Sequence, residues 1–150
     1  MHIPQFSLKR LLRMIFLRLQ AMDIWPGSYR PLLLKLGGIN IGHRTFVGGG
    51  ILFDTIHPEF ITIGDNTIIS MRCIILSHFV HQKQNDRSWS FGRVTIGKNC
   101  FIGANVIICQ PVTIGDNSAV AAGAVVTKDI PSGEIWGGVP ARFLKKAEME

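Results

Sequence analysis

The chain of 150 residues lacks the long apolar segments and the paired cysteines that mark membrane-spanning and disulfide-stabilised proteins. No stretch approaches the roughly 18 apolar residues that a membrane-spanning helix needs. Arg13 and Arg18 interrupt the run that comes nearest, and they also argue against a secretory signal. The three cysteines, Cys73, Cys100 and Cys109, form no Cys-x-x-Cys motif. We therefore expect neither a disulfide framework nor a zinc ribbon, and we expect a cytoplasmic location.

Charged residues are scarce, at 17% of the chain against 47% hydrophobic residues, which is typical of a folded globular protein. Their distribution along the chain is uneven. Residues 1–44 hold seven of the sixteen Lys and Arg residues and one acid, which accounts for the whole formal net charge of +6. The remaining chain is neutral and carries no recognised nucleic-acid-binding motif, so we expect no nucleic acid among the partners.

An aliphatic residue recurs at every sixth position through much of the chain. The longest run has six members: Ile96, Ile102, Ile108, Ile114, Val120 and Val126. A small or β-branched residue lies two positions before each following member: Cys100, Val106, Val112, Ser118 and Ala124. The same pattern occurs earlier, over residues 41–53 and 63–75. A period of six fits neither an amphipathic helix nor a regularly alternating strand.

This period predicts a backbone that coils. If each hexad is a short strand and a turn, the aliphatic residue points into a shared interior and the small residue lines that interior near a corner. Asn66, Asn99 and Asn117 fall at the turns, where asparagine tolerates positive φ. Three hexads then complete one three-sided coil, and successive coils stack about 4.8 Å apart.

The hexad pattern resembles the hexapeptide-repeat acyltransferases over residues 41–145. The resemblance implies an all-β fold, a left-handed parallel β-helix, built as a single domain. The expected segments are an N-terminal helical arm (1–38), the β-helix (39–131) and a C-terminal tail (132–150). Because 21 residues separate Ile75 from Ile96 where three hexads need 18, residues 79–93 are expected to leave the coil as a protruding loop.

Two helices are expected outside the coil. A short C-terminal helix is expected at residues 141–146. Near the N-terminus, apolar residues recur at helical spacing after the candidate N-cap Ser7: Leu8, Leu11, Leu12, Ile15, Leu19 and Met22. This apolar stripe predicts packing on the end of the coil or on a neighbouring subunit. As an alternative, the basic residues of segment 7–22 would hold the helix at an anionic membrane surface, as a peripheral contact at the inner face.

The protruding segment carries the densest set of reactive side chains, and His78 lies where it leaves the coil. The segment begins with His-x-x-His and returns with Phe-x-x-Val-Thr-Ile-Gly at residues 91–97, which resembles the galactoside and maltose O-acetyltransferases. The resemblance implies that His78 is the general base that takes the proton from an attacking sugar hydroxyl. A neutral imidazole suits this role at pH 7 and typically contributes about 10²- to 10⁴-fold to the rate. His81 is the alternative base.

Three residues are candidates for binding the acceptor: Asp54, His81 and Trp89. Asp54 and Glu59 lie in the irregular stretch before Ile63, where a carboxylate would contact an acceptor hydroxyl or orient the imidazole. A solvated loop is the alternative interpretation of these acids and of His57.

Binding of the donor acetyl-CoA is implied by the same resemblance for a second group of residues. Main-chain groups of Ala104 and Ala122 are expected along the pantetheine arm, and Thr127 and Lys128 near the adenosine end. Arg142, in Gly-Gly-Val-Pro-Ala-Arg, is expected to contact a phosphate. Lys and Arg suit phosphate groups because they form charge-assisted hydrogen bonds with them.

The resemblance therefore implies an acetyl-CoA-dependent O-acetyltransferase of surface-polysaccharide synthesis, a homotrimer that acts on a small-molecule or lipid-linked sugar. No metal is expected, because no histidine follows His81 and the three-imidazole zinc site of the γ-type carbonic anhydrases is therefore missing. Two alternatives stay open: an N-acyltransferase of the same fold, and a non-catalytic structural or binding β-helix. Cys73 and Cys100 fall in the small interior positions, which favours burial over a nucleophilic role.

Overall fold

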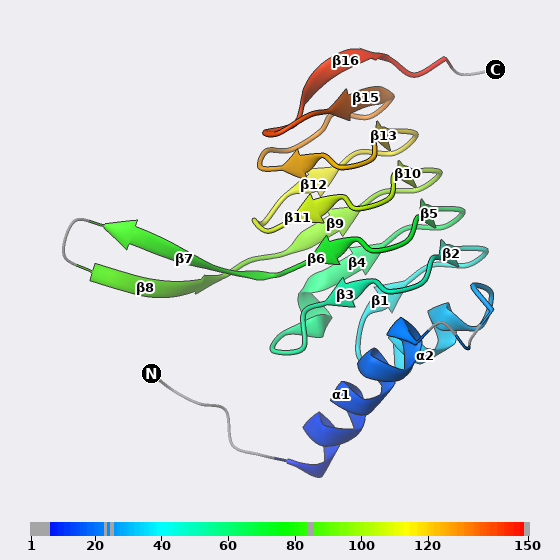
Figure 1. Ribbon diagram of the computed structural model, residues 1–150, viewed down its shortest axis with the longest axis vertical. Helices are drawn as coiled ribbons and strands as arrows, with labels where there is room; N and C mark the ends of the chain where they lie inside the picture. The colour runs from blue at the N-terminus through cyan, green and yellow to red at the C-terminus, as the bar shows by residue number, and fades with distance from the viewer. Residues whose placement is uncertain (1–6, 23, 25, 84–85, 149–150) are drawn as a thin grey trace.

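The computed structural model, shown in Figure 1, describes residues 7–22, 24, 26–83 and 86–148. Short strands stack one above another along the long axis of the molecule. Apart from a protruding hairpin and the last strand, they run parallel in three sheets, and each turn of the chain gives one strand to each sheet. The chain therefore passes through the first, second and third sheets in order, turn after turn.

The elements have the following bounds. The first sheet contains β1 (Asn40–Ile41), β4 (Ile61–Ile63), β9 (Val94–Ile96) and β12 (Thr113–Ile114). The second sheet contains β2 (Phe46–Val47), β5 (Ile68–Ile69), β10 (Phe101–Ile102), β13 (Ala119–Val120), β15 (Glu134–Gly137) and β16 (Arg142–Lys146). The third sheet contains β3 (Leu52–Phe53), β6 (Ile74–Ile75), β11 (Ile107–Ile108) and β14 (Val125–Val126). Outside the sheets lie α1 (Leu8–Ala21), α2 (Arg30–Leu36) and a 3₁₀ turn (Pro58–Phe60).

The interior of the stack consists of the hexad residues that the sequence predicts. Within each sheet these residues lie in register, as in the row Ile41, Ile63, Ile96 and Ile114 of the first sheet. All six members of the longest aliphatic run are buried, and so are the small residues that precede them. The predicted stack of parallel strands around an apolar interior is confirmed, and the left hand of the β-helix stays a prediction.

Asparagine occupies the turns between the first and second sheets, as predicted. Asn66, Asn99 and Asn117 have φ values of 55°, 53° and 58°. Their side chains also form a ladder, because Asn66 Nδ2 donates to Asn99 Oδ1 at 3.1 Å and Asn99 Nδ2 donates to Asn117 Oδ1 at 3.0 Å. The residue type that tolerates left-handed backbone thus also ties neighbouring turns together.

The protruding segment is a two-stranded hairpin, where the sequence predicted a loop. β7 (His78–Lys83) pairs with β8 (Asp86–Phe91) in antiparallel register, starting with His78 opposite Phe91. Figure 1 shows the hairpin extending sideways from the stack beyond β6. A long excursion can leave the coil in this way because the two strands satisfy each other's backbone groups.

Helix α1 forms where the sequence predicts it, with Ser7 as N-cap, but it turns an unexpected face to the coil. Leu17 and Gln20 are buried, and Gln20 Nε2 donates to the carbonyl oxygen of Ile51 at 2.9 Å. Most of the predicted apolar stripe stays exposed: Leu8, Leu12, Ile15 and Met22. The expected packing on the coil end therefore occurs through Leu17 and Gln20, which lie outside the predicted stripe. Neither described helix has the length and apolar character needed to cross a bilayer.

The prediction of a C-terminal helix at residues 141–146 is wrong. This segment forms β16, which runs antiparallel to β15 with Arg142 opposite Gly137. So short a segment is marginal as a helix, whereas the free edge of β15 offers hydrogen bonds to a strand. Lys146 Nζ closes the pair of strands at 2.6 Å from Glu134 Oε1.

Adjacent residues of β12 provide a matched test of the interior. Ile114 is fully buried, and Thr113 is exposed on the outer surface. Ile114→Ala is expected to lower the free energy of unfolding by about 2–5 kcal/mol, because it leaves a cavity in a packed interior. Thr113→Ala should change it by no more than about 0.5 kcal/mol, as measured by urea denaturation. Equal losses from the two changes would contradict the inward assignment of the hexad residue.

Candidate active site

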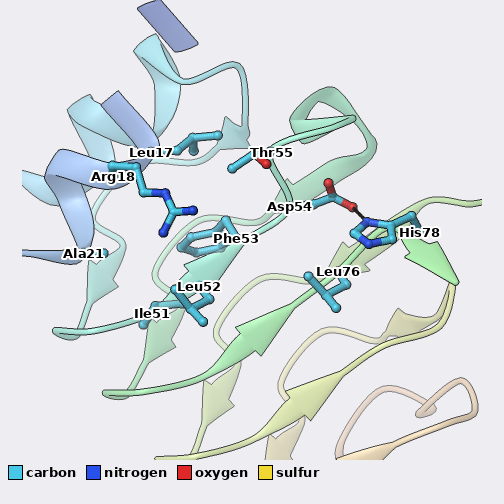
Figure 2. Close-up of a pocket in the computed structure, with 10 residues that line it drawn as sticks. All are labelled: Leu17, Arg18, Ala21, Ile51, Leu52, Phe53, Asp54, Thr55, Leu76 and His78. Atoms are coloured by element: carbon cyan, nitrogen blue, oxygen red, sulfur yellow. Dashed lines mark hydrogen bonds and ion pairs between the residues drawn. The ribbon is translucent and has the colours of Figure 1, made fainter. Parts of the chain in front are cut away.

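The candidate active site lies at the corner where the third sheet passes to the first. Asp54 directly follows β3, and His78 follows β6 one turn later and begins the hairpin. Figure 2 shows the two side chains meeting at this corner, with 2.6 Å between His78 Nδ1 and Asp54 Oδ2. The structure thus brings together two of the residues that the sequence singled out.

Donors surround the carboxylate of Asp54, which is only 1% exposed. Its Oδ2 accepts from the hydroxyl of Ser77 at 2.7 Å and from the backbone N–H of Ser77 at 2.9 Å, and its Oδ1 accepts from the backbone N–H of Ile56 at 2.7 Å. Burial alone would raise the pKa of Asp54, but the hydrogen bonds from Ser77, His78 and Ile56 outweigh burial and hold the pKa below its ordinary value. Asp54 is therefore ionised at neutral pH.

The charge on Asp54 fixes the position of the proton on His78. An ionised carboxylate only accepts hydrogen bonds, so Nδ1 of His78 must be the donor. In the neutral ring Nε2 then keeps a free lone pair, which is the arrangement of a histidine that acts as a general base. The side chain of His78 is 21% exposed, so a substrate has access to it.

Ser77 is the site residue that the sequence analysis did not assign. Its place two residues after Ile75 puts it at a corner of the coil. No spacing rule reveals its two hydrogen bonds to Asp54, because they depend on how the irregular stretch after β3 folds back onto the corner.

The hairpin adds an aromatic side chain beside the imidazole. The ring centroid of Trp89 lies 5.5 Å from that of His78, and Trp89 is 51% exposed. This predicted acceptor-binding residue therefore borders the candidate base. His81 pairs with Ser88 along the hairpin backbone, and the side chain of His81 lies outside the described residues.

The irregular stretch after β3 packs against the end of the hairpin that joins the coil. The ring of His57 stacks on Phe60 at 5.0 Å and meets Phe91 edge-on at 4.7 Å. His57 Nδ1 lies 3.1 Å from Glu59 Oε1, and the carbonyl oxygen of His57 accepts from the Ser77 hydroxyl at 3.2 Å. His57 and Glu59 thus stabilise residues that surround the site and do not contact Nε2 of His78.

A pocket of about 200 Å³ opens beside the Asp54–His78 pair, between the coil and helix α1. Side chains of β3 and of α1 share its wall, and α1 contributes Leu17 and Arg18. The sequence did not predict that this helix lines the site, because helical periodicity shows which residues share a face but not which face meets the coil.

The predicted donor-binding residues divide between the two edges of the third sheet. Thr127 and Lys128 follow β14 on the edge that holds the candidate base, two turns further along the stack. Ala104 and Ala122 lie in the turns at the opposite edge, after β10 and β13. Arg142 begins β16 and is exposed. Within one chain, the two alanines and the candidate base therefore lie on different corners.

The cysteines show little sign of reactivity. Cys73 and Cys100 are buried, as predicted, and burial raises the pKa of both thiols. A raised pKa leaves less of the reactive thiolate at neutral pH. Cys109 is half-buried. In the described part of the chain, no three His, Cys, Asp or Glu side chains form a group that could hold a metal ion.

The lowered pKa of Asp54 predicts acid-dependent stability. Because folding lowers this pKa, the ionised carboxylate stabilises the fold above the ordinary carboxyl range, and its contribution is lost as the pH falls through the lowered value. Near pH 7 we expect the wild type to exceed Asp54→Asn in free energy of unfolding by about 1.5–3 kcal/mol. Urea denaturation should show this difference shrinking below about pH 4. A difference that does not change with pH would contradict the ionised state of Asp54.

Comparison with curated proteins finds acetyltransferases. Residues 93–128 match the family model described as the hexapeptide repeat of succinyl-transferase. Galactoside O-acetyltransferase of Escherichia coli (strain K12) is 43% identical over 122 residues, which cover 77% of this chain and 58% of that enzyme. The chain spans 63% and 65% of the length of two further curated relatives, from Bacillus subtilis (strain 168) and Schizosaccharomyces pombe.

Solved structures agree with the curated relatives. A maltose O-acetyltransferase from Clostridium difficile 630 superposes with a TM-score of 0.67 at 27% identity, over 94% of this chain and 87% of that one. A galactoside acetyltransferase in complex with coenzyme A gives a TM-score of 0.67 at 26% identity, over 93% and 81% of the two chains. Hexads in the interior, a stack of parallel strands and these relatives lead to one conclusion: the chain is similar in sequence and in fold to the hexapeptide-repeat acetyltransferases.

Proposed function

We propose that this protein transfers an acetyl group from acetyl-CoA to a sugar hydroxyl, with His78 as the general base. The observation that carries the proposal is the Asp54–His78 pair, in which a buried, ionised carboxylate holds an imidazole at the edge of a pocket. The relatives support the donor and the acceptor class, because one is named a galactoside O-acetyltransferase and another was solved with coenzyme A.

In the proposed transfer, the Asp54–His78 pair takes up the proton of the acceptor hydroxyl and later releases it to the leaving group. Nε2 of His78 takes the proton from the acceptor hydroxyl while the hydroxyl oxygen attacks the thioester carbonyl carbon. Asp54 holds the ring through Nδ1 and stabilises the imidazolium that forms. When the tetrahedral intermediate collapses, the C–S bond breaks and the imidazolium returns the proton to the leaving thiolate. This direct route needs no acyl-enzyme, in agreement with the burial of Cys73 and Cys100.

Exposed cations at the C-terminal end of the stack are proposed to bind the donor phosphates. Lys128 and Arg142 are both exposed, and Arg142 uses Nη1 to donate to the carbonyl oxygen of Ala141 at 2.9 Å. Lys128 and Thr127 lie on the same edge as His78, so a donor bound there would extend its thioester along that edge toward the imidazole.

The outer surfaces of the sheets differ in polarity, which supports a homotrimer. In the second sheet Phe46, Ile68 and Phe101 lie in register, and each is 43–48% exposed. The corresponding outward residues of the first sheet are polar: Asn40, Thr62, Thr95 and Thr113. An exposed apolar row of this kind is typical of an interaction surface. We propose that it packs on a neighbouring subunit, which would bring Ala104 and Ala122 of one chain toward the candidate base of the next.

The exposed apolar stripe of α1 supports an acceptor near a membrane. Its members face away from the coil: Leu8, Leu12, Ile15 and Met22. Lys9, on the same helix, is also exposed. An apolar stripe with nearby cations is typical of helices that lie in the surface of an anionic bilayer. We therefore propose a peripheral membrane contact through α1 and a lipid-linked sugar of surface-polysaccharide synthesis as one acceptor.

The two alternative functions differ from this proposal in their chemistry. A non-catalytic β-helix would not need an ionised carboxylate buried against an imidazole, which is a costly arrangement to retain in a protein interior. An N-acyltransferase would use the same base, and only the acceptor, an amine instead of a hydroxyl, separates it from the proposed function. Amino sugars therefore belong in the acceptor screen.

His78 provides the test of the mechanism. His78→Ala is expected to lower kcat by about 10²- to 10⁴-fold, because it removes the group that accepts the proton. The thermal shift caused by coenzyme A should persist, since His78 is not proposed to bind the donor phosphates. Acetyl transfer to a panel of sugars and amino sugars, followed by mass spectrometry, would measure the activity. His43→Ala, an exposed histidine at another corner, is the matched control.

The outcomes of the His78 test separate the alternatives. Full activity of His78→Ala would overturn the proposed base, and an equal loss from His81→Ala alone would move the role to His81. Absence of any coenzyme A stabilisation in the wild type would favour the non-catalytic β-helix.

Sedimentation tests the proposed trimer. The wild type should sediment near three times the chain mass of 16.6 kDa. Phe101→Glu is expected to dissociate the assembly, because it places a charge in the apolar row. Thr113→Glu makes the same kind of change on the polar first sheet and should leave the assembly intact. A wild-type monomer at micromolar concentration would contradict a site completed by two subunits.

A further inference from the structure

Arg18 is a cation of the candidate site to which the proposed transfer gives no role. It belongs to α1, but its side chain lines the same pocket as Asp54 and His78. Figure 2 shows its guanidinium reaching from the helix toward Phe53, across the pocket from His78. Apart from the Asp54–His78 pair and Thr55, the other lining residues are apolar.

The guanidinium of Arg18 has no partner in the described part of the chain. No hydrogen bond or ion pair joins it to any described residue, although other arginines nearby are bound. Arg13 Nη1 lies 3.6 Å from Glu59 Oε2, and Arg30 Nη1 donates to the carbonyl oxygen of Val47 at 3.2 Å. The donors of Arg18 therefore face the pocket without an acceptor from the protein.

Asp54 is the carboxylate that lines this pocket, and both of its oxygens already accept hydrogen bonds. Its Oδ2 accepts from Ser77 and His78, and its Oδ1 accepts from the backbone N–H of Ile56. Asp54 and Arg18 form no ion pair. Arg18 is exposed, so water satisfies its guanidinium when no ligand is bound, and its planar fork of N–H donors matches a carboxylate or a phosphate.

The position of Arg18 separates it from the residues proposed for the donor. In the third sheet β6 lies between β3 and β11, so the corner of His78 has β3 on one side and β11 and β14 on the other. Thr127 and Lys128 follow β14, whereas Arg18 approaches from the side of β3. The acceptor sugar is therefore expected on the side of Arg18, with the imidazole between the two substrates.

We propose that Arg18 binds an anionic group of the acceptor, a carboxylate or a phosphate, and so directs the enzyme toward acidic or phosphorylated sugars. This inference rests on the proposed function, because it takes His78 as the group that activates the acceptor. It adds a substrate class to that function. A guanidinium paired with an anion beside an apolar wall would favour such sugars over their neutral parents.

Acceptor pairs that differ in one anionic group test the proposal. The ratio of kcat/KM for galactose 1-phosphate over methyl galactoside, and for methyl galacturonoside over methyl galactoside, would be measured with acetyl-CoA in excess. In the wild type we expect at least one ratio to be about tenfold or more, because one charge-assisted hydrogen bond typically contributes that much to affinity. Arg18→Gln should bring that ratio close to one, and Arg18→Lys should keep part of it. Lys35→Gln removes an exposed charge from α2 outside the pocket and should leave the ratio unchanged.

Binding without turnover separates this inference from the proposed function. Saturation-transfer NMR of galactose 1-phosphate and of methyl galacturonoside should show weaker binding to Arg18→Gln than to the wild type. The two sugars distinguish a phosphate from a carboxylate as the preferred group. Equal binding of the anionic sugars to both proteins, or equal ratios in both, would overturn the role of Arg18 while transfer to neutral sugars could still stand. A loss of coenzyme A stabilisation in Arg18→Gln would place Arg18 on the donor side and also overturn it. If no sugar accepts an acetyl group, the proposed function itself fails.

Discussion

The register of the inward hexad residues is the constraint on which the site depends. Phe53 pairs with Ile75 across neighbouring strands of the third sheet, so the chain segments that follow them leave the stack at one corner. Asp54 is one residue beyond the first and His78 three residues beyond the second, and this offset lets the carboxylate meet the imidazole. A one-residue slip of either strand would turn its buried side chain outward and separate the two groups. The register of the strands thus fixes both the apolar packing and the position of His78.

The sequence predicted those features that depend on residue type and spacing within a short segment. The period of six identified the interior, since an aliphatic side chain that must be buried recurs at Ile96, Ile102 and Ile108. The asparagines at the turns identified the left-handed corners. The extra residues between Ile75 and Ile96 identified the excursion, whose first residue is His78.

The remaining features depend on contacts between distant segments, which no spacing rule contains. The face that α1 turns to the coil buries Leu17 and Gln20, and Gln20 donates to the carbonyl oxygen of Ile51, a contact that helical periodicity does not reveal. The last segment became a strand because β15 had a free edge. Ser77 gained its role only when the stretch after β3 folded back, and Arg18 entered the site only because α1 crosses that end of the coil.

Three of the seven basic residues among the first 44 have a place in the fold or at the candidate site. Arg13 pairs with Glu59, and Arg30 is buried and donates to a backbone carbonyl. Arg18 faces the pocket. Asp54 lines the same pocket but forms no ion pair with Arg18, because its oxygens accept from Ser77, His78 and Ile56.

The two ends of the stack are covered in different ways. In a stack of parallel strands, the strands at each end have unpaired N–H and C=O groups, with which another chain could pair. Helices α1 and α2 cover one end, and at the other β16 reverses direction and places Arg142, Lys145 and Lys146 on the outermost strand. An antiparallel strand with positive charges is a poor template for a further parallel strand, so this end of the stack resists pairing with another chain.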